Sequence, residues 1–457
     1  MAAVASEKMH EPAGVGEAVA FSASSSPPAA AIRIVDTFRV HPSPPTPEET
    51  SLPLTFLDVF WVPKPPLQLI LFYRLVPGVD WDTVVAKLRD SLSHAVRAFF
   101  PLAGRLRLTP GSTADRYELY YRSGDAVAFT VAGCEDDFDS LAAYEPREVT
   151  KIAPLAPPLP DGGAVLALQA TLLPARGGLG LALGFTVHHA ACDGAAATHF
   201  LHTWAAAACS AAARSPPVID RTLISVPRGL YNVLSAAAEG KVLVKMPDDQ
   251  LLATFTLSRA NLQRVKDVVA ASTRCTSLVA ALGFVWSCYQ RAKQGDGGRS
   301  SFLALPVDHR SRMRPPLPAE YFGNCVGFAL AIASIRDLAE ASVSGRLLAA
   351  CTAIAAGIEE AVSGVDTETA MEPSKDDQAD AMRGLLTVAE SPRFRMYDLD
   401  MGFGRPVKVD IVSAAKTGVF ALAESRAGDG GIEVGVSLPP EGMDAFRNCF
   451  ADAVARL

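Results

Sequence analysis

Residues 185–200 read FTVHHAACDGAAATHF, in which two histidines end an apolar run and an aspartate follows four residues after the second. The preceding segments, VLALQATLL (165–173) and GLALGFTVHH (180–189), are β-like, and the glycines between them suit a hairpin. Asp193 can cap the alanine-rich helix predicted after it. The stretch therefore predicts a strand end, a tight turn and a helix start, a geometry that presents side chains rigidly.

The histidine pair is compatible with a catalytic base, with a metal site or with no chemistry. A histidine acts as a general base when its pKa lies near the operating pH and it reaches the proton that it removes. The HxxxD spacing alone favours His188 and His189 as buried, hydrogen-bonded core residues. A zinc site needs further ligands, and His199 and His202 fall on a different part of the next helix. A serine hydrolase would usually offer GxSxG, which the sequence lacks.

The composition excludes several classes of function. Of 457 residues, 49% are hydrophobic, enough for large cores, and the net charge of −7 argues against a nucleic-acid binder. No apolar run reaches the ~18 residues that span a bilayer, and the N-terminus is not a secretory signal. The eight cysteines are scattered without a CxxC pair, which favours reduced thiols. We therefore expect a cytoplasmic protein with neither a nucleic-acid nor a membrane partner.

The length predicts two domains, since domains usually contain ~100–200 residues. Residues 1–32 are rich in Ala, Ser, Pro and Gly and are expected to be a disordered lead-in. The proline-containing stretch 216–250 is the candidate crossover between an N-terminal domain, 33–215, and a C-terminal domain, 251–457. Strand-like and helix-like segments mix in both halves, so the expected fold class is α/β.

Several elements carry start signals. Asp80 or Asp82 can cap a helix, Ser258 caps an amphipathic helix after a strand, and Thr276 caps a more buried helix. The end of the chain adds three strand signals and a last helix: VKVDIVS (407–413), VFALAES (419–425), IEVGVSL (432–438) and the segment from Met443.

Other blocks of sequence accompany the histidine motif. They are LPLTFLDVFW (52–61), FFPLAGRL (99–106), VDHRSRMRPPLP (307–318), YFGNCVG (321–327) and DMGFGRP (400–406). Together with HHAACDG (188–194), and in this order, they resemble the plant BAHD acyltransferases, whose hallmarks are HxxxDG and a DFGWG-like motif. The resemblance begins at about residue 33. The blocks LPLTFLDVFW and YFGNC look most like the branch of the family that acylates anthocyanin, flavonoid and phenolic glucosides, often with malonyl-CoA.

The resemblance implies an α/β fold of two similar mixed-sheet domains, like chloramphenicol acetyltransferase, with an active-site channel between them. His189 would take the proton of the acceptor hydroxyl, and the oxygen would attack the thioester of acyl-CoA. Asp193 would orient the motif, and His188 would be structural. Acyl-CoA is then a co-substrate, with no metal or bound cofactor, and the protein is expected to be a monomer.

The resemblance also assigns structural and binding roles. Asp400, Gly402 and Gly404 would form a structural motif, with Asp400 paired to Arg310. Here Met401 and Phe403 depart from the Phe and Trp of DFGWG. Further candidates are Ser391 as oxyanion donor and Arg274, Thr276 and Ser277 as CoA ligands at a helix start. The alternative for the last three is an ordinary helix cap beside a surface arginine.

Three alternatives remain open at this stage. The donor could be a hydroxycinnamoyl-CoA, because the helix GAAATHFLHTW (194–204) offers no Arg or Lys for a malonyl carboxylate. A condensation domain of peptide synthesis also carries HHxxxDG, but the chain has no carrier segment. A catalytically inactive binding homologue would be expected to have a damaged HxxxD motif, which is intact here.

Overall fold

The computed structural model describes the chain in eight parts: residues 32–111, 116–225, 231, 249–293, 299–363, 385–389, 391–417 and 419–457. The predicted lead-in, apart from its last residue, and most of the predicted crossover therefore lie outside the described residues. The domain boundaries stay a prediction.

Five strands from the first half of the chain and β14 (Lys408–Ile411) from the second half form a six-stranded sheet with the strand order β1-β6-β8-β9-β3-β14. The first half also forms a three-stranded sheet with the order β2-β5-β4. Only β6 and β8 pair in parallel within the larger sheet. The elements of this half are β1 (Arg33–Val40), β2 (Glu49–Pro53), α1 (Phe56–Val59), β3 (Leu67–Arg74), α2 (Trp81–Ala98), β4 (Arg105–Leu108), β5 (Tyr117–Arg122), β6 (Val127–Gly133), α3 (Phe138–Leu141), β7 (Arg147–Glu148), α4 (Val149–Ile152), β8 (Leu166–Ala175), β9 (Gly178–Val187) and α5 (Gly194–Ala208).

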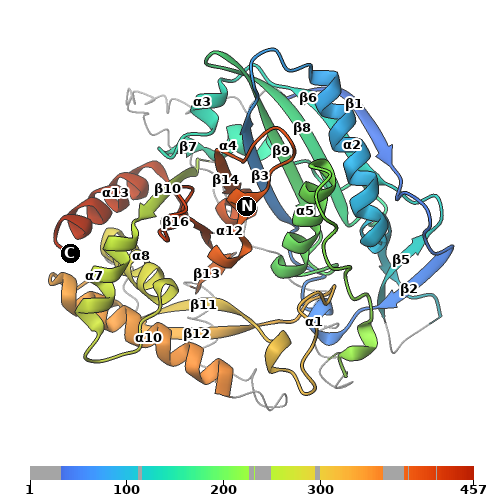
Figure 1. The fold of residues 1–457 in the computed structure, drawn as a ribbon. Helices are drawn as coiled ribbons and strands as arrows, with labels where there is room; N and C mark the ends of the chain where they lie inside the picture. Colours follow the sequence, from blue (N-terminus) through green and yellow to red (C-terminus); the bar gives the residue numbers. More distant parts are fainter. Residues whose placement is uncertain are drawn as a thin grey trace, which may run out of the picture.

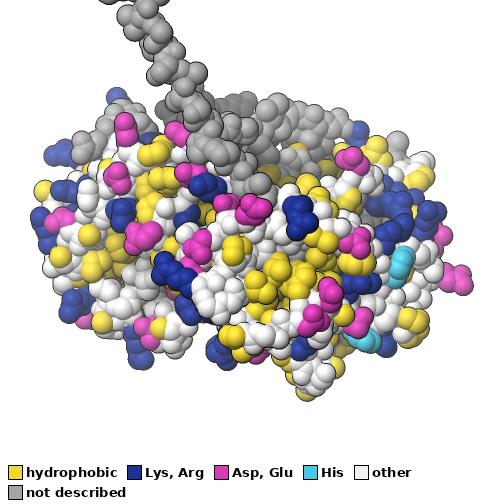
Figure 2. All heavy atoms as spheres, turned by 90° about the horizontal axis from the view of Figure 1, so that it is seen from above, with side chains coloured by type: hydrophobic (Ala, Val, Ile, Leu, Met, Phe, Trp, Pro, Cys, Tyr) yellow, Lys and Arg dark blue, Asp and Glu magenta, His cyan; other side chains and the backbone are white. Residues whose placement is uncertain are grey.

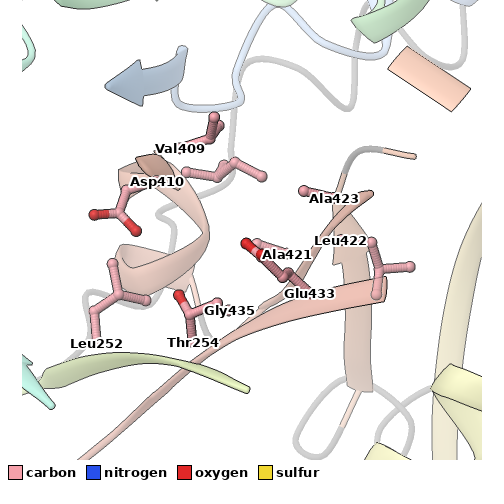
Figure 3. A pocket seen from close by; sticks show the side chains of 10 residues that line it. Leu252, Thr254, Val409, Asp410, Ala421, Leu422, Ala423, Glu433 and Gly435 are labelled. Atoms are coloured by element: carbon pink, nitrogen blue, oxygen red, sulfur yellow. The ribbon is translucent and has the colours of Figure 1, made fainter. Parts of the chain in front are cut away.

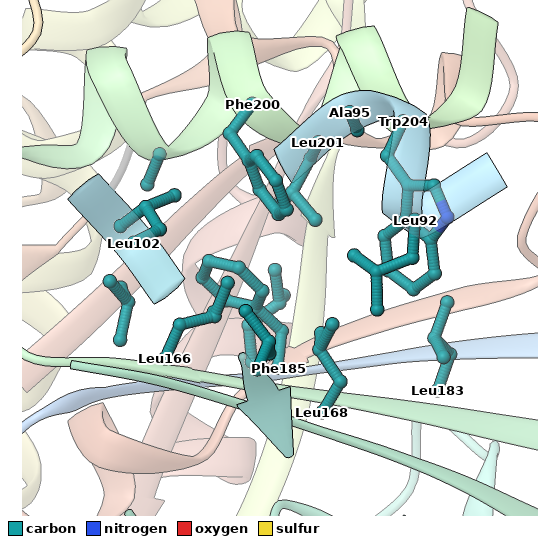
Figure 4. Packing of buried hydrophobic residues seen from close by; sticks show 14 of the residues in the cluster. Leu92, Ala95, Leu102, Leu166, Leu168, Leu183, Phe185, Phe200, Leu201 and Trp204 are labelled. Carbon is teal, nitrogen blue, oxygen red and sulfur yellow. The ribbon is translucent and has the colours of Figure 1, made fainter. Parts of the chain in front are cut away.

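The helices α2 and α5 pack against each other and against one face of this sheet (Figure 4). Leucine, alanine and aromatic side chains at helical spacing meet the inward residues of β8 and β9. Trp204 of α5 is fully buried, and its indole N–H donates to Ser91 Oγ at 3.0 Å. A buried indole without such an acceptor would be costly, so this bond fixes how the two helices dock.

Six strands from the second half of the chain and β7 from the first half form a seven-stranded sheet with the order β12-β11-β13-β15-β16-β10-β7. Helices α7, α8, α10 and α13 lie on the left of Figure 1, and each contacts a strand of this sheet. The elements are β10 (Leu251–Leu257), α7 (Arg259–Val269), α8 (Ser277–Ala292), β11 (Ser300–Asp308), β12 (Val326–Ser334), α9 (Ile335–Leu338), α10 (Val343–Ser363), β13 (Leu385–Ala389), β14 (Lys408–Ile411), α12 (Val412–Thr417), β15 (Val419–Glu424), β16 (Ile432–Leu438) and α13 (Pro440–Ala455).

Each large sheet includes one strand from the other half of the sequence. β14 pairs with β3 of the N-terminal sheet, and β7 pairs with β10 of the C-terminal sheet. At this junction the Asp410 carboxylate accepts from Arg147 at 2.6 and 3.0 Å and from Lys408 at 2.9 Å. Burial alone would raise the pKa of Asp410, but the two cations lower it to about 2. Asp410 and Glu433 line a cavity of about 20 Å³, room for about one water molecule (Figure 3).

The elements with local start signals are confirmed. Asp80 caps α2, Ser258 caps α7 in a capping box, and Thr276 caps α8. The strand signal VKVDIVS is only half right, because the chain turns into α12 at Val412. The last helix starts at Pro440, three residues before the predicted Met443, since proline suits the first turn of a helix.

The surface carries both signs of charge, as expected from the similar numbers of basic and acidic residues in the sequence. On the face shown in Figure 2, basic and acidic side chains are interspersed with apolar ones. Within the described parts of the chain, no helix is long and apolar enough to cross a bilayer. All eight cysteines are free thiols, and five of them are buried.

Candidate active site

His189 is placed by the hairpin before it and the helix after it. The N–H of His188 still donates to the Val165 carbonyl oxygen at 2.8 Å, so hairpin pairing continues into the motif. Asp193 caps α5 by accepting from the Ala196 N–H at 3.0 Å. The strand, turn and helix predicted around the motif are confirmed, and they hold His189 between two rigid elements.

The imidazole of His189 is half-buried and is contacted on its face and its edge. Trp61 stacks on the ring, with centroids 3.5 Å apart and planes inclined by 9°. The ring atom Nδ1 lies 3.2 Å from Oδ1 of Asn324. Burial lowers the pKa of His189 from 6.5, and the nearby Asp193 charge opposes this effect. The ring is therefore neutral at neutral pH, which is the state that a general base requires.

The partners of Asn324 determine which ring nitrogen carries the proton. Its amide nitrogen, Nδ2, donates to Oδ1 of Asp58 and to the carbonyl oxygen of His189, both at 2.9 Å. Both partners can only accept, so the amide oxygen must face the imidazole. Since that oxygen also only accepts, Nδ1 is the protonated ring nitrogen. The lone pair of Nε2 is then the basic site.

Asp193 is buried, and donors occupy both of its carboxylate oxygens. Its two oxygens accept from the Arg310 guanidinium at 2.8 and 2.9 Å, and one also accepts from the Cys325 N–H at 2.9 Å. The predicted pair between Arg310 and Asp400 is therefore wrong. Asp193 takes both ends of the guanidinium fork, which matches the geometry of a carboxylate. The pair joins the HxxxD turn to the second half of the chain.

Comparison with known proteins shows the family of this chain. Residues 30–453 match the model of a family described as the Transferase family. Phenolic glucoside malonyltransferase 1 of Arabidopsis thaliana is 31% identical over 91% of this chain and 96% of its own length. The malonyl-CoA:anthocyanidin 5-O-glucoside-6''-O-malonyltransferase of the same plant is 30% identical, with 92% and 98% coverage. The chain belongs to the BAHD acyltransferase family.

Further comparisons cover the fold and the range of activities in BAHD acyltransferases. The structure of vinorine synthase matches with a TM-score of 0.66 at 21% identity, covering 91% of this chain and 96% of that one. The predicted two-domain, mixed-sheet fold is thus confirmed. A coumaroyl-CoA:anthocyanidin 3-O-glucoside-6''-O-coumaroyltransferase of Arabidopsis thaliana is 28% identical, with 93% and 98% coverage. The chain is an acyl-CoA-dependent acyltransferase, and its relatives use malonyl or coumaroyl donors.

The DMGFG segment of this BAHD acyltransferase forms a turn. Oδ1 of Asp400 accepts from the N–H groups of Gly402 and Gly404 at 2.7 and 3.1 Å. Both glycines have left-handed φ values, 81° and 106°, which explains why neither position carries a side chain. Phe403 packs edge-on against Tyr73 at 5.1 Å between ring centroids. Asp400 therefore stabilises a turn, where the sequence predicted an ion pair.

The other histidines near the motif are bound to the backbone. Nδ1 of His188 accepts from the Ala190 N–H at 3.2 Å, and burial lowers the pKa of His188 to about 4. Nε2 of His199 and of His202 contact backbone carbonyl oxygens at 2.9 and 2.8 Å. No cluster of three potential metal-ligating His, Cys, Asp or Glu side chains occurs among the described residues.

Ser391 lies in a segment that docks beside the motif of this acyltransferase. Its Oγ accepts from the Arg393 N–H at 3.2 Å and so caps the short 3₁₀ turn at Pro392–Phe394. The Phe394 ring packs so closely on Gly194 that a Cβ there would come within 2.9 Å of it. The segment therefore contacts the start of α5, but the proposed oxyanion role of Ser391 stays a prediction.

The three CoA candidates share the start of α8. The Thr276 side chain accepts from the Val279 N–H at 3.3 Å and caps the helix. Ser277 Oγ lies 2.8 Å from Nζ of Lys266, a cation on α7 that was not among the predicted CoA ligands. Arg274 is exposed. The two interpretations, a helix cap and an anion site, are compatible. A capped helix start still has free N–H groups, and Arg274 and Lys266 lie beside it.

Three residues of the site were not predicted from the sequence: Trp61, Asn324 and Asp58. All three lie in LPLTFLDVFW or YFGNCVG, which were used as family markers without roles for individual residues. The two blocks are separated by more than 250 residues, and no local pattern indicates that they meet at His189. The signal that the sequence offered was a polar residue within an apolar block, such as Asp58 or Asn324, because a polar side chain in the core needs a hydrogen-bond partner.

Proposed function

We propose that this enzyme transfers an acyl group from acyl-CoA to a hydroxyl of a phenolic, flavonoid or anthocyanin glucoside, with His189 as the general base. The observation that carries this proposal is the oriented, neutral imidazole. Asn324 occupies Nδ1, burial keeps the ring uncharged, and Nε2 is left to accept a proton.

The reaction follows from that geometry. Nε2 of His189 removes the acceptor's hydroxyl proton as the oxygen attacks the thioester carbon. A C–O bond forms, and the carbonyl electron pair moves to oxygen as an oxyanion. Collapse of this intermediate breaks the C–S bond, and the imidazolium returns its proton to the CoA sulfur. Such base catalysis contributes ~10²–10⁴ in rate, and positioning of the two substrates contributes much of the rest.

Two further parts of the proposal concern charge. Ser391 is our candidate donor to the oxyanion, because its segment contacts the start of α5 next to the motif. Arg274, Thr276 and Ser277, now with Lys266, are candidates for the CoA phosphates, because cations and a helix N-terminus both favour phosphate.

Malonyl-CoA is the first candidate donor, in line with the names of the relatives of 30% and 31% identity. A hydroxycinnamoyl-CoA is the second candidate, and the aromatic surroundings of His189 favour it. The Phe328 ring lies 5.8 Å from that of Trp61 and is 43% exposed. The arginines Arg221 and Arg310 are already paired with Asp58 and Asp193, so a malonyl carboxylate would need another cation.

The test is a matrix of acyl-CoA donors and aromatic glucoside acceptors, read as CoA release and product mass. We expect an ester product with at least one flavonoid or phenolic glucoside. His189→Ala should lose this activity, while His188→Ala should keep most of it. The absence of product from every pair, or an active His189→Ala protein, would contradict the proposed function.

Equal concentrations of malonyl-CoA and coumaroyl-CoA in one reaction decide between the donors. A mainly malonylated product supports the first candidate, and a mainly coumaroylated product supports the second. Cytoplasmic location and a monomeric state belong to the same proposal. Imaging of a tagged protein and light scattering during gel filtration test them.

A further inference from the structure

Asp58 lies in the first turn of α1 and has no exposed surface. Its oxygen Oδ2 accepts from the N–H and the hydroxyl of Thr55 at 2.8 and 2.7 Å. Its other oxygen, Oδ1, accepts from the N–H and the amide group of Asn324, both at 2.9 Å. A buried carboxylate with this many donors is held in one orientation, and it holds its donors in turn.

Arg221 supplies the opposite charge. Its Nη1 lies 2.7 Å from Oδ1 of Asp58, and both side chains are at most 4% exposed. Its Nη2 donates to the Ala191 carbonyl oxygen at 2.8 Å, two residues beyond His189. The ion pair therefore connects α1, the start of the crossover and the HxxxD turn.

The Asn324 amide transmits this order to the imidazole. One of its N–H groups points to Asp58 and the other to the His189 carbonyl oxygen, so its oxygen is directed at Nδ1. Without Asp58, only one of these two acceptors would remain. An N–H group left unsatisfied in the interior is costly, so the amide would turn or shift. Either movement removes the reason for Nδ1 to keep the proton.

We propose that Asp58 is a positioning residue for acyl transfer, which acts through Asn324 to keep the proton of His189 on Nδ1 and the lone pair on Nε2. The inference rests on the proposed role of His189 as the base. It assigns Asp58 no contact with either substrate.

A matched pair of double variants isolates the acceptor oxygen at position 58. Asp58→Asn/Arg221→Met removes both charges, but its amide oxygen can still accept from Asn324 while its NH₂ group faces the Thr55 hydroxyl. The Thr55 N–H loses its acceptor in both double variants, so the two still differ in the oxygen that faces Asn324. Asp58→Leu/Arg221→Met removes the charges and the acceptor. Neither leaves a buried charge unpaired, the usual reason why such variants unfold. Glu118→Leu/Arg107→Met is the control, because it removes another ion pair with a buried carboxylate, with 2.6 Å between the charged groups.

The readout is the ¹⁵N spectrum of the His189 imidazole, assigned by its loss in His189→Ala, together with kcat and KM. In the wild-type enzyme we expect a protonated Nδ1 and an unprotonated Nε2. The Asp58→Asn double variant and the Glu118→Leu control should keep this pattern. The Asp58→Leu double variant should show protonation on Nε2, with kcat lowered about 10- to 100-fold and the KM for acyl-CoA little changed.

Three results would overturn the inference. A wild-type enzyme with the proton on Nε2 would do so without any variant, even if the Asp58→Leu protein failed to fold. The inference would also fail if His189 had the same tautomer in the Asp58→Asn and Asp58→Leu double variants. A loss of kcat in the Asp58→Leu double variant without a change of tautomer would make Asp58 merely structural. Failure of the proposed function is separate, because the spectrum can be read in a protein that transfers no acyl group.

Discussion

The proposed base, His189, gives a prediction at the scale of a single residue. Burial lowers the pKa of its imidazole, so the base form persists below the ordinary value of 6.5. We expect kcat/KM to be constant from about pH 8 down to about pH 6.5 and to fall only as the pH drops through the lowered pKa. A pH profile of kcat/KM with one acceptor measures this directly. An acid limb above 6.5 would mean that the imidazole is not the buried base described here.

Asp193 is expected to matter for folding as well as activity. Asp193→Asn removes the buried charge partner of the Arg310 guanidinium and leaves only the exposed Asp308 beside it, which costs ~3–5 kcal/mol. The same change disturbs the HxxxD turn, so activity should fall severely. Denaturant titration and kcat measure the two effects. Asp308→Asn is the control, since Asp308 also contacts Arg310, at 3.2 Å, but is 57% exposed and should cost less than ~1 kcal/mol.

The DMGFG turn gives a prediction at the scale of an element. Asp400→Ala removes the acceptor of two N–H groups from a half-buried turn, so stability should fall by roughly 1–2 kcal/mol. Asp400→Asn should keep most of it, because the amide oxygen can still accept. Thermal melts of both variants, with kcat for comparison, provide the test. A collapse of kcat at unchanged melting temperature would place Asp400 in the chemistry instead.

The exchanged strands give a second prediction at this scale. Asp410→Ala removes the carboxylate that the buried Arg147 and Lys408 share between β14 and β7, at a cost of ~3–5 kcal/mol. Because both sheets meet there, calorimetry should still show one transition, at a lower temperature. Asp139→Asn, which breaks the more exposed ion pair with Arg74, should barely move the melt. Two separated transitions in the Asp410→Ala variant would mean that the halves fold independently.

The elements of the fold were largely predictable from sequence, whereas the partners within the site were not. Caps such as Asp80, Ser258 and Thr276 act within four residues, so their signals are local. The pair between Arg310 and Asp193 spans 117 residues, and several carboxylates in the sequence could have matched that guanidinium equally well. Charge complementarity does not encode distance, which is why Asp400 was chosen wrongly.

At the scale of the whole molecule, half-buried neutral histidines make stability depend on pH. Burial lowers the pKa of His188, His189, His199, His202 and His309. In the unfolded chain these side chains bind protons near 6.5, so their contribution is complete above that pH. It is lost as the pH falls, for His188 down to about 4.

We therefore expect the melting temperature to decrease steadily between about pH 6.5 and about pH 4. His188→Gln should flatten part of this slope, because glutamine does not titrate. Scanning calorimetry in buffers of equal ionic strength gives the slope for both proteins. A melting temperature that stayed constant or rose on acidification would contradict the prediction.

The exchange of β7 and β14 between the sheets has a consequence for hybrid enzymes. A gene fusion that takes everything up to the crossover from one relative and the remainder from another would not keep each parent's sheet intact. The new protein would pair β3 of one parent with β14 of the other, and β10 with a foreign β7. Productive recombination therefore requires that these two short strands travel with the sheets they complete, as cassettes of a few residues outside the main exchange.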